Sequence, residues 1–214
     1  ANATIGFRYE KNNRYGGAFV PRLALTKKVE NLHFKVLYSQ AFRAPSIQNI
    51  NIALNGESKP EKSNVFEIEL GYQFTPEMLL ALNAFSITTR DVLIYGSEGE
   101  DDTFTEWYEN YDKSGTRCIE VVYNIRKKRW YGTVTYSLNQ AAPGNTVDKY
   151  EVPQTSRQFV GFPASKLTTN INVTLIDGLS VNGSLIYSGT RYGYTTLDQD
   201  DATEIPIGFN FDFF

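Results

Sequence analysis

The sequence KLTTNINVTLIDGLSVNGSLIYSG, residues 166–189, alternates between apolar and polar side chains with a period of two. Successive side chains of a β-strand point to opposite faces, so this period predicts two strands, each with one apolar and one polar face. The tripeptide Ile-Asp-Gly at residues 176–178 predicts a tight hairpin turn between them. The stretch therefore predicts two long antiparallel strands.

The same alternation recurs in three other runs, residues 32–39, 64–74 and 130–139, and predicts a strand at each. In LLALNAFSITT, residues 79–89, two sets of apolar side chains compete, so the sequence leaves open which face of this strand is apolar. Counting such runs from ATIGFRYE at the start to IPIGFNFDFF at the end predicts about ten strands.

The amino-acid composition favours an all-β chain. There are 14 Tyr and 14 Phe among 214 residues but one Met, and aromatic side chains favour strands and membrane interfaces. No apolar run approaches the roughly 18 to 20 residues of a membrane-spanning helix, whereas a membrane-spanning strand needs only about 9 to 11 residues. A transmembrane barrel is therefore compatible with the mean hydropathy of −0.36.

Charge and residue counts argue against several classes of protein. A net charge of −3 disfavours a nucleic-acid partner, because binding phosphates needs clustered Lys and Arg. The single cysteine, Cys118, excludes an internal disulfide or a multi-thiolate zinc site. The single histidine, His33, lies near a predicted turn, so a structural role is favoured over metal ligation and a Ser-His-Asp arrangement lacks its base. We expect no metal site, no cofactor and no enzymatic activity.

The predicted connections alternate between short and long. Three-residue links occur at residues 29–31, 75–77, 126–128 and 176–178, and long ones at residues 39–63, 89–114, 140–165 and 189–204, with a shorter member of the long set at residues 11–17. In an antiparallel meander, links of one parity leave from the same end of the sheet. Turns at one end and large loops at the other are typical of outer-membrane barrels. A soluble β-sandwich is the alternative, and it would cover its apolar face with a second sheet.

Two motifs carry a resemblance to a known family. YSQAFRAPSI (residues 38–47) followed by KPEKSNVFEIELGYQF (residues 59–74) resembles the paired signature of TonB-dependent outer-membrane receptors, and GTRCIEVVYNI (residues 115–125) and FPASKLTTNI (residues 162–171) extend the resemblance over nearly the whole chain.

The resemblance implies an all-β fold, an antiparallel transmembrane β-barrel of about 22 strands to which this chain contributes about ten. Residues 1–214 would form one partial barrel domain in the outer membrane. The expected partners are TonB, contacted through a missing amino-terminal part, the receptor's own plug domain, outer-membrane lipid and a small-molecule ligand.

The motif residues have a structural interpretation. Pro45 lacks an N–H group and disfavours helix at Ala44, so it ends a strand; Arg43 is then free to bind carbonyls or a carboxylate of the loop. Pro60 sets the angle at which the next strand begins, and Lys59 and Glu61 are able to pair at the rim. The set comprises Phe42, Arg43, Ala44, Pro45, Lys59, Pro60 and Glu61, and we favour loop architecture over direct ligand contact for it.

Charged side chains on the polar strand faces need water or a partner, because they cannot face lipid. The resemblance implies that they face the lumen and the plug domain. They are Arg8, Arg22, Lys35, Glu67, Glu69 and Glu120.

Aromatic and Arg residues of the long loops are the candidates for ligand binding, because rigid rings and the Arg fork bind with little loss of entropy. They are Trp107, Tyr108, Tyr111, Tyr150, Arg157, Arg191, Tyr192 and Tyr194. An iron–siderophore suits this set best. Cobalamin or a glycan in the same family, or a passive porin or adhesin barrel, are the alternatives.

Overall fold

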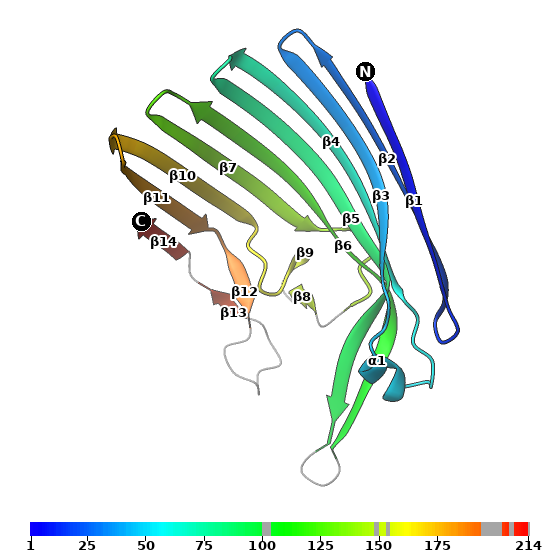
Figure 1. Cartoon of the computed structure of the whole chain (residues 1–214). Helices are drawn as coiled ribbons and strands as arrows, with labels where there is room; N and C mark the ends of the chain where they lie inside the picture. The colour runs from blue at the N-terminus through cyan, green and yellow to red at the C-terminus, as the bar shows by residue number, and fades with distance from the viewer. Residues whose placement is uncertain (100–103, 148–149, 153–154, 194–202, 206–207, 214) are drawn as a thin grey trace.

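A computed structural model describes residues 1–99, 104–147, 150–152, 155–193, 203–205 and 208–213. Its main feature is one antiparallel sheet of ten strands in chain order, with β1 and β14 at its two edges (Figure 1). The strands are β1 (Asn2–Asn12), β2 (Gly16–Val29), β3 (Leu32–Arg43), β4 (Glu61–Thr75), β5 (Met78–Glu98), β6 (Thr105–Arg126), β7 (Trp130–Ala141), β10 (Ser165–Ile176), β11 (Leu179–Ser188) and β14 (Gly208–Phe213). The prediction of about ten strands in a meander is confirmed.

The connections alternate as predicted. Turns join β2 to β3, β4 to β5, β6 to β7 and β10 to β11. In the last of these, Gly178 has φ 85°, a left-handed conformation that glycine adopts without steric cost. The opposite end of the sheet carries the long connections, which contain helix α1 (Ile47–Asn51) and the hairpins β8 (Glu151–Val152) with β9 (Thr155–Phe159) and β12 (Arg191–Gly193) with β13 (Thr203–Ile205).

No helix that the structure describes is long and apolar enough to cross a membrane.

The connection between β5 and β6 corrects the sequence prediction. The prediction of a long loop over residues 89–114 is wrong for most of that range, because β5 and β6 stay paired outward to Glu98 and Thr105. The ladder skips Asp91, whose φ is 54°. The hairpin extends beyond the sheet because its residues bury an apolar cluster of their own, in which Val92 and Ile94 pack with Val147.

The register gathers the apolar side chains on one face of the sheet. Leu70, Leu82, Val121, Tyr136 and Leu167 lie opposite one another on five consecutive strands. All but Leu167 are more than a third exposed, although they are apolar. No second layer covers this face within the described residues, which contradicts the sandwich and fits a surface in contact with lipid.

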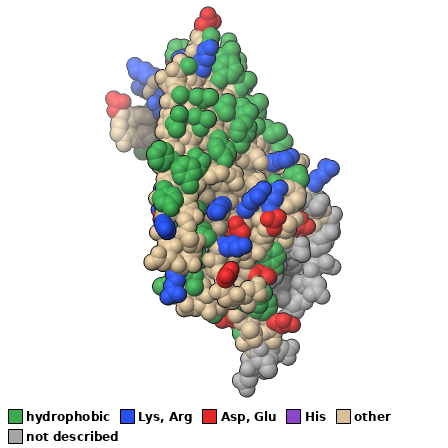
Figure 2. Space-filling model, turned by 90° about the vertical axis from the view of Figure 1, so that its right-hand side faces the viewer, with side chains coloured by type: hydrophobic (Ala, Val, Ile, Leu, Met, Phe, Trp, Pro, Cys, Tyr) green, Lys and Arg blue, Asp and Glu red, His purple; other side chains and the backbone are tan. Residues whose placement is uncertain are grey.

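The register also settles the ambiguous strand. Leu80 lies opposite Tyr72, and Leu82 opposite Leu70, so the even-numbered residues of β5 join the apolar face. Phe85 and Ile87 point to the other face with Glu67 and Val65. Figure 2 shows the resulting band of hydrophobic side chains, with charged side chains of both signs gathered below it.

Candidate functional site

Charged side chains follow the face of the sheet opposite the apolar one, which we call the lumen face. Lys35, Glu69, Asn83 and Glu120 lie directly opposite one another on β3 to β6. The same alternation places Glu67, Arg22 and Arg8 on this face. All six charged residues named from the sequence therefore share one surface.

Ion pairs link the lumen face near its turn end. Lys35 Nζ lies 2.7 Å from Glu67 Oε1 and 3.8 Å from Glu69 Oε2. His33 Nε2 lies 2.7 Å from Glu69 Oε1, so the only histidine is held in a structural contact between β3 and β4. Among the described residues, Arg22 and Glu120 have no ion-pair partner.

The imidazole of His33 requires a glycine at the position opposite it on β4, which is Gly71. A Cβ added at Gly71 would lie 1.7 Å from His33 Cε1, so no larger residue fits while His33 holds Glu69. We expect Gly71→Ala to cost about 1 to 3 kcal/mol of unfolding free energy in detergent, as overpacking does elsewhere. The combination Gly71→Ala with His33→Ser should cost less than the sum of the two single changes. Additive losses would show that the ring does not set this requirement.

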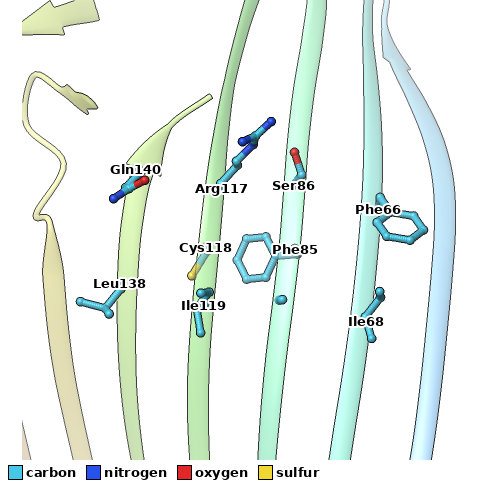
Figure 3. Close-up of a pocket in the computed structure, with 10 residues that line it drawn as sticks. Phe66, Ile68, Phe85, Ser86, Arg117, Cys118, Ile119, Leu138 and Gln140 are labelled. Carbon is cyan, nitrogen blue, oxygen red and sulfur yellow. The ribbon is translucent and has the colours of Figure 1, made fainter. Parts of the chain in front are cut away.

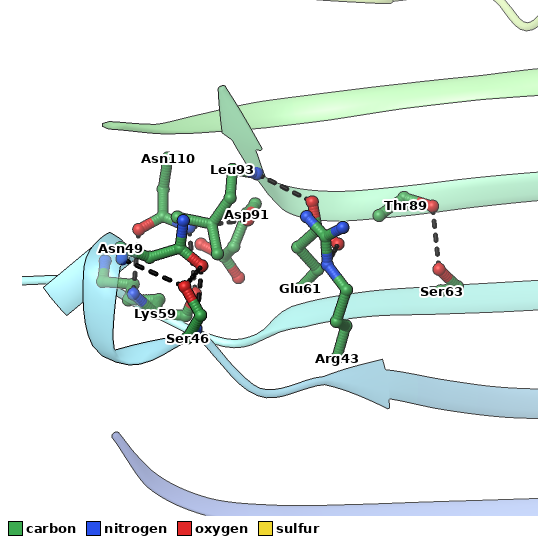
Figure 4. Close-up of polar contacts among 10 residues, drawn as sticks. All are labelled: Arg43, Ser46, Asn49, Lys59, Glu61, Ser63, Thr89, Asp91, Leu93 and Asn110. Carbon is green, nitrogen blue, oxygen red and sulfur yellow. Dashed lines mark hydrogen bonds and ion pairs between the residues drawn. The ribbon is translucent and has the colours of Figure 1, made fainter. Parts of the chain in front are cut away.

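Arg43 and Glu61 form a brace between the ends of β3 and β4 (Figure 4). Arg43 Nε lies 2.6 Å from Glu61 Oε2, and Glu61 Oε1 accepts a hydrogen bond of 2.8 Å from the backbone N–H of Leu93. The pairing of Lys59 with Glu61 that the sequence allowed is not formed, because the Glu61 carboxylate binds Arg43 and the β5 backbone instead. The brace thus ties the motif to the base of the β5–β6 extension.

Asn110 on β6 completes this junction, and the sequence analysis did not single it out. Its Oδ1 accepts from Lys59 N at 2.8 Å, and its Nδ2 donates to Lys59 O at 3.0 Å and to Asp91 O at 2.6 Å. Pro45 and Pro60 are buried beside these contacts. The connection between β3 and β4 is therefore held against the extension by backbone groups, which a side-chain motif does not reveal.

The helix α1 begins directly after the first motif. Ser46 caps it, with its Oγ accepting from Asn49 N at 3.2 Å, and the Asn49 side chain in turn accepts from Ser46 N at 2.8 Å. After the helix, Tyr108 N donates to Ile52 O and Leu54 N donates to Tyr108 O, each at 2.9 Å. These contacts seat the loop on β6.

Backbone hydrogen bonds join the other loops into one assembly. Thr146 N donates to Lys113 O at 2.8 Å, which ties the loop after β7 to β6. Val160 N donates to Tyr150 O at 2.9 Å, and Gly161 N donates to Tyr192 O at 2.6 Å. Of the predicted ligand-binding residues, Tyr150 in the second long connection and Tyr192 in the third are therefore brought together around residues 160–161.

The first group of candidate aromatics lies on a strand rather than in a loop, and its rings are engaged in packing. Trp107 covers Gly96, where an added Cβ would lie 2.5 Å from the indole. Tyr111 packs on the buried cluster of Val92 and Ile94, and Tyr108 meets Tyr95 edge-on at 5.5 Å between ring centroids. Part of each side chain is therefore committed to the extension itself.

The remaining candidates are more varied in setting. Tyr95, which contacts Tyr108 but is not itself a candidate, donates to the Glu106 carboxylate, and this hydrogen bond raises the pKa of the Tyr95 hydroxyl above its ordinary value. Tyr150 packs edge-on against Phe159 with centroids 6.4 Å apart, and Arg157 is exposed on β9. Tyr194 lies outside the described residues. No group of three or more His, Cys, Asp or Glu is placed to hold a metal ion within the part of the chain that the structure describes.

A pocket of about 450 Å³ lies on the lumen face below the joined loops. It is bounded by Phe162, Lys166, Arg191 and Glu120, together with Ser and Thr side chains of β7 and β10. The Nε atom of Arg191 is buried and lacks a hydrogen-bond partner among the described residues. Of the residues named from sequence, Arg191 and Glu120 meet here; Phe162 and Lys166 were missed, although they lie within the FPASKLTTNI motif.

Comparisons with known proteins agree with this architecture. No curated protein sequence matches the chain. Among solved structures, it is similar to the siderophore receptor PirA from Acinetobacter baumannii, with a TM-score of 0.71 and 16% identity over 99% of this chain and 36% of that one. It is also similar to the ferric enterobactin receptor PfeA from Pseudomonas aeruginosa, with a TM-score of 0.74 and 15% identity over 99% of this chain and 34% of that one.

A third structure is FpvA of P. aeruginosa in an iron–pyoverdine complex, with a TM-score of 0.67 and 14% identity over 92% of this chain and 26% of that one. The chain thus spans about a third of the length of PirA and PfeA and about a quarter of the length of FpvA. Residues 2–208 match the family model described as TonB dependent receptor-like, beta-barrel. The chain therefore belongs to the TonB-dependent receptor β-barrel family of the bacterial outer membrane.

Proposed function

We propose that this chain forms part of the barrel of a receptor that takes up an iron–siderophore in a TonB-dependent manner. The observation that carries the proposal is the pocket at the loop end of the lumen face. It places two cations, Lys166 and Arg191, beside the ring of Phe162. Siderophores are often anionic and partly aromatic, so this combination of charge and ring surface suits them. The similarity to receptors of ferric enterobactin and pyoverdine supports the same ligand class.

The unpaired charges of the lumen face support a second component of the proposal. Arg22 and Glu120 point into the lumen without ion-pair partners among the described residues, and charges in such a position require water or a protein partner. In the proposed receptor that partner is its own plug domain, and TonB acts on the plug through an amino-terminal segment. The candidates Trp107, Tyr108, Tyr111, Tyr150, Arg157 and Tyr192, with Tyr194 beyond the described residues, would line the approach from outside.

The test uses the full-length receptor with Lys166→Gln and Arg191→Gln combined. We expect ferric-siderophore binding in detergent to weaken about 30-fold, corresponding to about 2 kcal/mol for loss of a central charged anchor. The matched control is Arg126→Gln, which removes a cation from the turn end of the same strand face. Unchanged binding in the double variant would remove this pocket from the ligand site.

Growth under iron limitation tests the uptake reaction itself. Cells carrying the wild-type receptor should depend on both the siderophore and TonB, and the double variant should need a higher siderophore concentration. Uptake that persists without TonB would favour the passive barrel. Binding of cobalamin or an oligosaccharide, with no binding of any ferric siderophore tried, would overturn the ligand assignment.

A further inference from the structure

The charged groups of the lumen-face pocket bear on the chemical class of its ligand. The described lining contains two cations, Lys166 and Arg191, and one carboxylate, Glu120. Glu120 has no ion-pair partner among the described residues, and it lies in one row with Ser137 and Lys166 across β6, β7 and β10. Two cations and one carboxylate leave the pocket with a net charge of +1, so a ligand of small net charge matches it better than a polyanion does.

Most of the other groups that line the pocket are neutral and polar. The aromatic residues of the described lining are Phe162 and Phe85, and Phe85 on β5 lies beside Cys118 on β6 (Figure 3). Hydroxyl and amide groups can both donate and accept hydrogen bonds, so they suit a ligand that is rich in neutral carbonyl and amide groups. The neutral polar side chains are Thr135, Ser137, Asn139, Thr168 and Ser188.

The extension of β5 and β6, which stands outward from the pocket, is strongly acidic. Both strands line the pocket and continue beyond the sheet as the extension (Figure 1). From Asp91 to Asp112 the sequence contains no Lys, Arg or His. Glu98 and Glu106 are exposed, and none of the described carboxylates of the extension forms an ion pair with another described residue. The carboxylates of this segment are Asp91, Glu98, Glu100, Asp101, Asp102, Glu106, Glu109 and Asp112.

Arg191 contributes a donor that is ready for a ligand. Its Nε atom is buried and has no hydrogen-bond partner among the described residues, whereas buried polar groups are ordinarily paired. An anion that approaches this donor from the loop end meets the carboxylates of the extension, which repel it over a distance set by the ionic strength. Attraction inside the pocket therefore competes with repulsion outside it, and the balance depends on the charge of the ligand.

We propose that the pocket takes a tris-hydroxamate ferric complex rather than a tris-catecholate one, an inference that rests on the proposed siderophore function. Three hydroxamates lose one proton each and neutralise Fe(III), whereas three catechols lose two protons each and leave the complex a trianion. The extension and Glu120 repel a trianion but have little effect on an uncharged complex. The oxygen atoms around the iron still accept hydrogen bonds from Lys166 and Arg191 when the complex is neutral.

The experiment compares ferrichrome, an uncharged tris-hydroxamate complex, with ferric enterobactin, a tris-catecholate trianion, on the full-length receptor in detergent. We expect ferrichrome to bind at least about 30-fold more tightly, which corresponds to about 2 kcal/mol. Salt screens exposed charges, so a higher ionic strength should accelerate the association of ferric enterobactin. The association rate of ferrichrome should change little.

Variants assign this discrimination to particular carboxylates. Glu98→Gln combined with Glu106→Gln should accelerate the association of ferric enterobactin about 5-fold at low ionic strength, because it weakens the repulsion from the extension. Glu120→Gln should strengthen ferric enterobactin binding about 10-fold by slowing its dissociation. Both should leave ferrichrome binding within about 2-fold of the wild type. The matched control is Asp177→Asn, which removes a carboxylate at the turn end and should change neither ligand.

The possible outcomes separate the ligand class from the proposed function. The class is overturned, and siderophore uptake retained, if ferric enterobactin or a ferric hydroxycarboxylate binds the wild type as tightly as ferrichrome does. It is also overturned if ferric enterobactin binding responds neither to the extension variant nor to Glu120→Gln, or responds equally to Asp177→Asn. Failure of every ferric siderophore to bind overturns both the class and the proposed function.

Discussion

Replacing Ile171 by arginine should lower the free energy of unfolding in a bilayer by about 2 to 4 kcal/mol, the range for a cation on the lipid face near the membrane centre. Ile171 lies in the middle of β10, on the apolar face, with 44% of its surface exposed in the isolated chain. Its direct neighbours across the strands are Gly132 and Gly183, so no side chain beside it offers the guanidinium a partner. Refolding of the full-length receptor into lipid vesicles, followed by denaturant titration, measures the loss.

Asn172→Arg is the matched control, because it places the same charge one residue further along the same strand. Asn172 lies opposite Asn182 on the lumen face, where water or protein can solvate a cation. Its cost should be well below that of Ile171→Arg. Equal losses for the two substitutions would mean that the strand faces are assigned wrongly, and with them the membrane orientation of the whole sheet.

Replacing Glu61 by alanine should lower the free energy of local unfolding at the loop end by about 1 to 3 kcal/mol. The Glu61 side chain is only 12% exposed, and without it the backbone N–H of Leu93 loses a charged acceptor in a buried setting. Its pairing with Arg43 adds little to this figure, because the Arg43 side chain is 65% exposed and solvent screens the attraction. Amide exchange at Leu93 and protease cleavage within residues 46–58 should both accelerate.

Lys59→Ala is the control for the brace. Lys59 meets Asn110 through its backbone N–H and carbonyl, so truncating its exposed side chain should leave both readouts near wild type. If Glu61→Ala leaves Leu93 exchange unchanged, the motif does not brace this junction. If Lys59→Ala accelerates cleavage as much as Glu61→Ala does, its ammonium group contributes to the rim in a way the contacts do not show.

The two faces of the sheet differ in polarity, and the predictions separate them. Ile171 reports on the lipid face, whereas Lys166, Arg191 and Asn172 report on the lumen face. Ile171→Arg should therefore leave siderophore binding intact in receptor that has folded, and the combined Lys166→Gln and Arg191→Gln variant should leave the stability of the lipid face intact. This independence follows from the strict alternation of side chains along each strand.

Strand number, orientation and, in every strand except β5, the polarity of each face were determined by local sequence. The alternation in residues 166–189 places Ile171 and Asn172 on opposite faces whatever the neighbouring strands do, because a period of two is a property of the extended backbone. The alternating order of short and long links likewise required no knowledge of contacts, although the length of the link between β5 and β6 did. Pro45 marked the end of β3 for the same local reason, its missing N–H.

The features that only the tertiary structure decided all depend on residues far apart in the chain. The apolar face of β5 followed from the register, because Leu82 and Phe85 are both apolar and lie on opposite faces of the strand. Leu82 lies opposite Leu70 and Phe85 lies opposite Glu67 on β4, and these neighbours show which of the two faces is the apolar one. Glu61 binds Arg43 and the Leu93 amide rather than Lys59, which is close in sequence, because the folded chain brings Arg43 and Leu93 within hydrogen-bond distance of its carboxylate.

The extension of β5 and β6 beyond the sheet has the same origin. Its residues read as a polar loop, yet Val92 and Ile94 are buried by Val147, more than 50 positions further along the chain. The pocket that joins Lys166 to Arg191 depends on the loop after β11 folding back onto β10. Local sequence determines the period and the turns of a strand, whereas side-chain partners depend on distances that arise only when the sheet has formed.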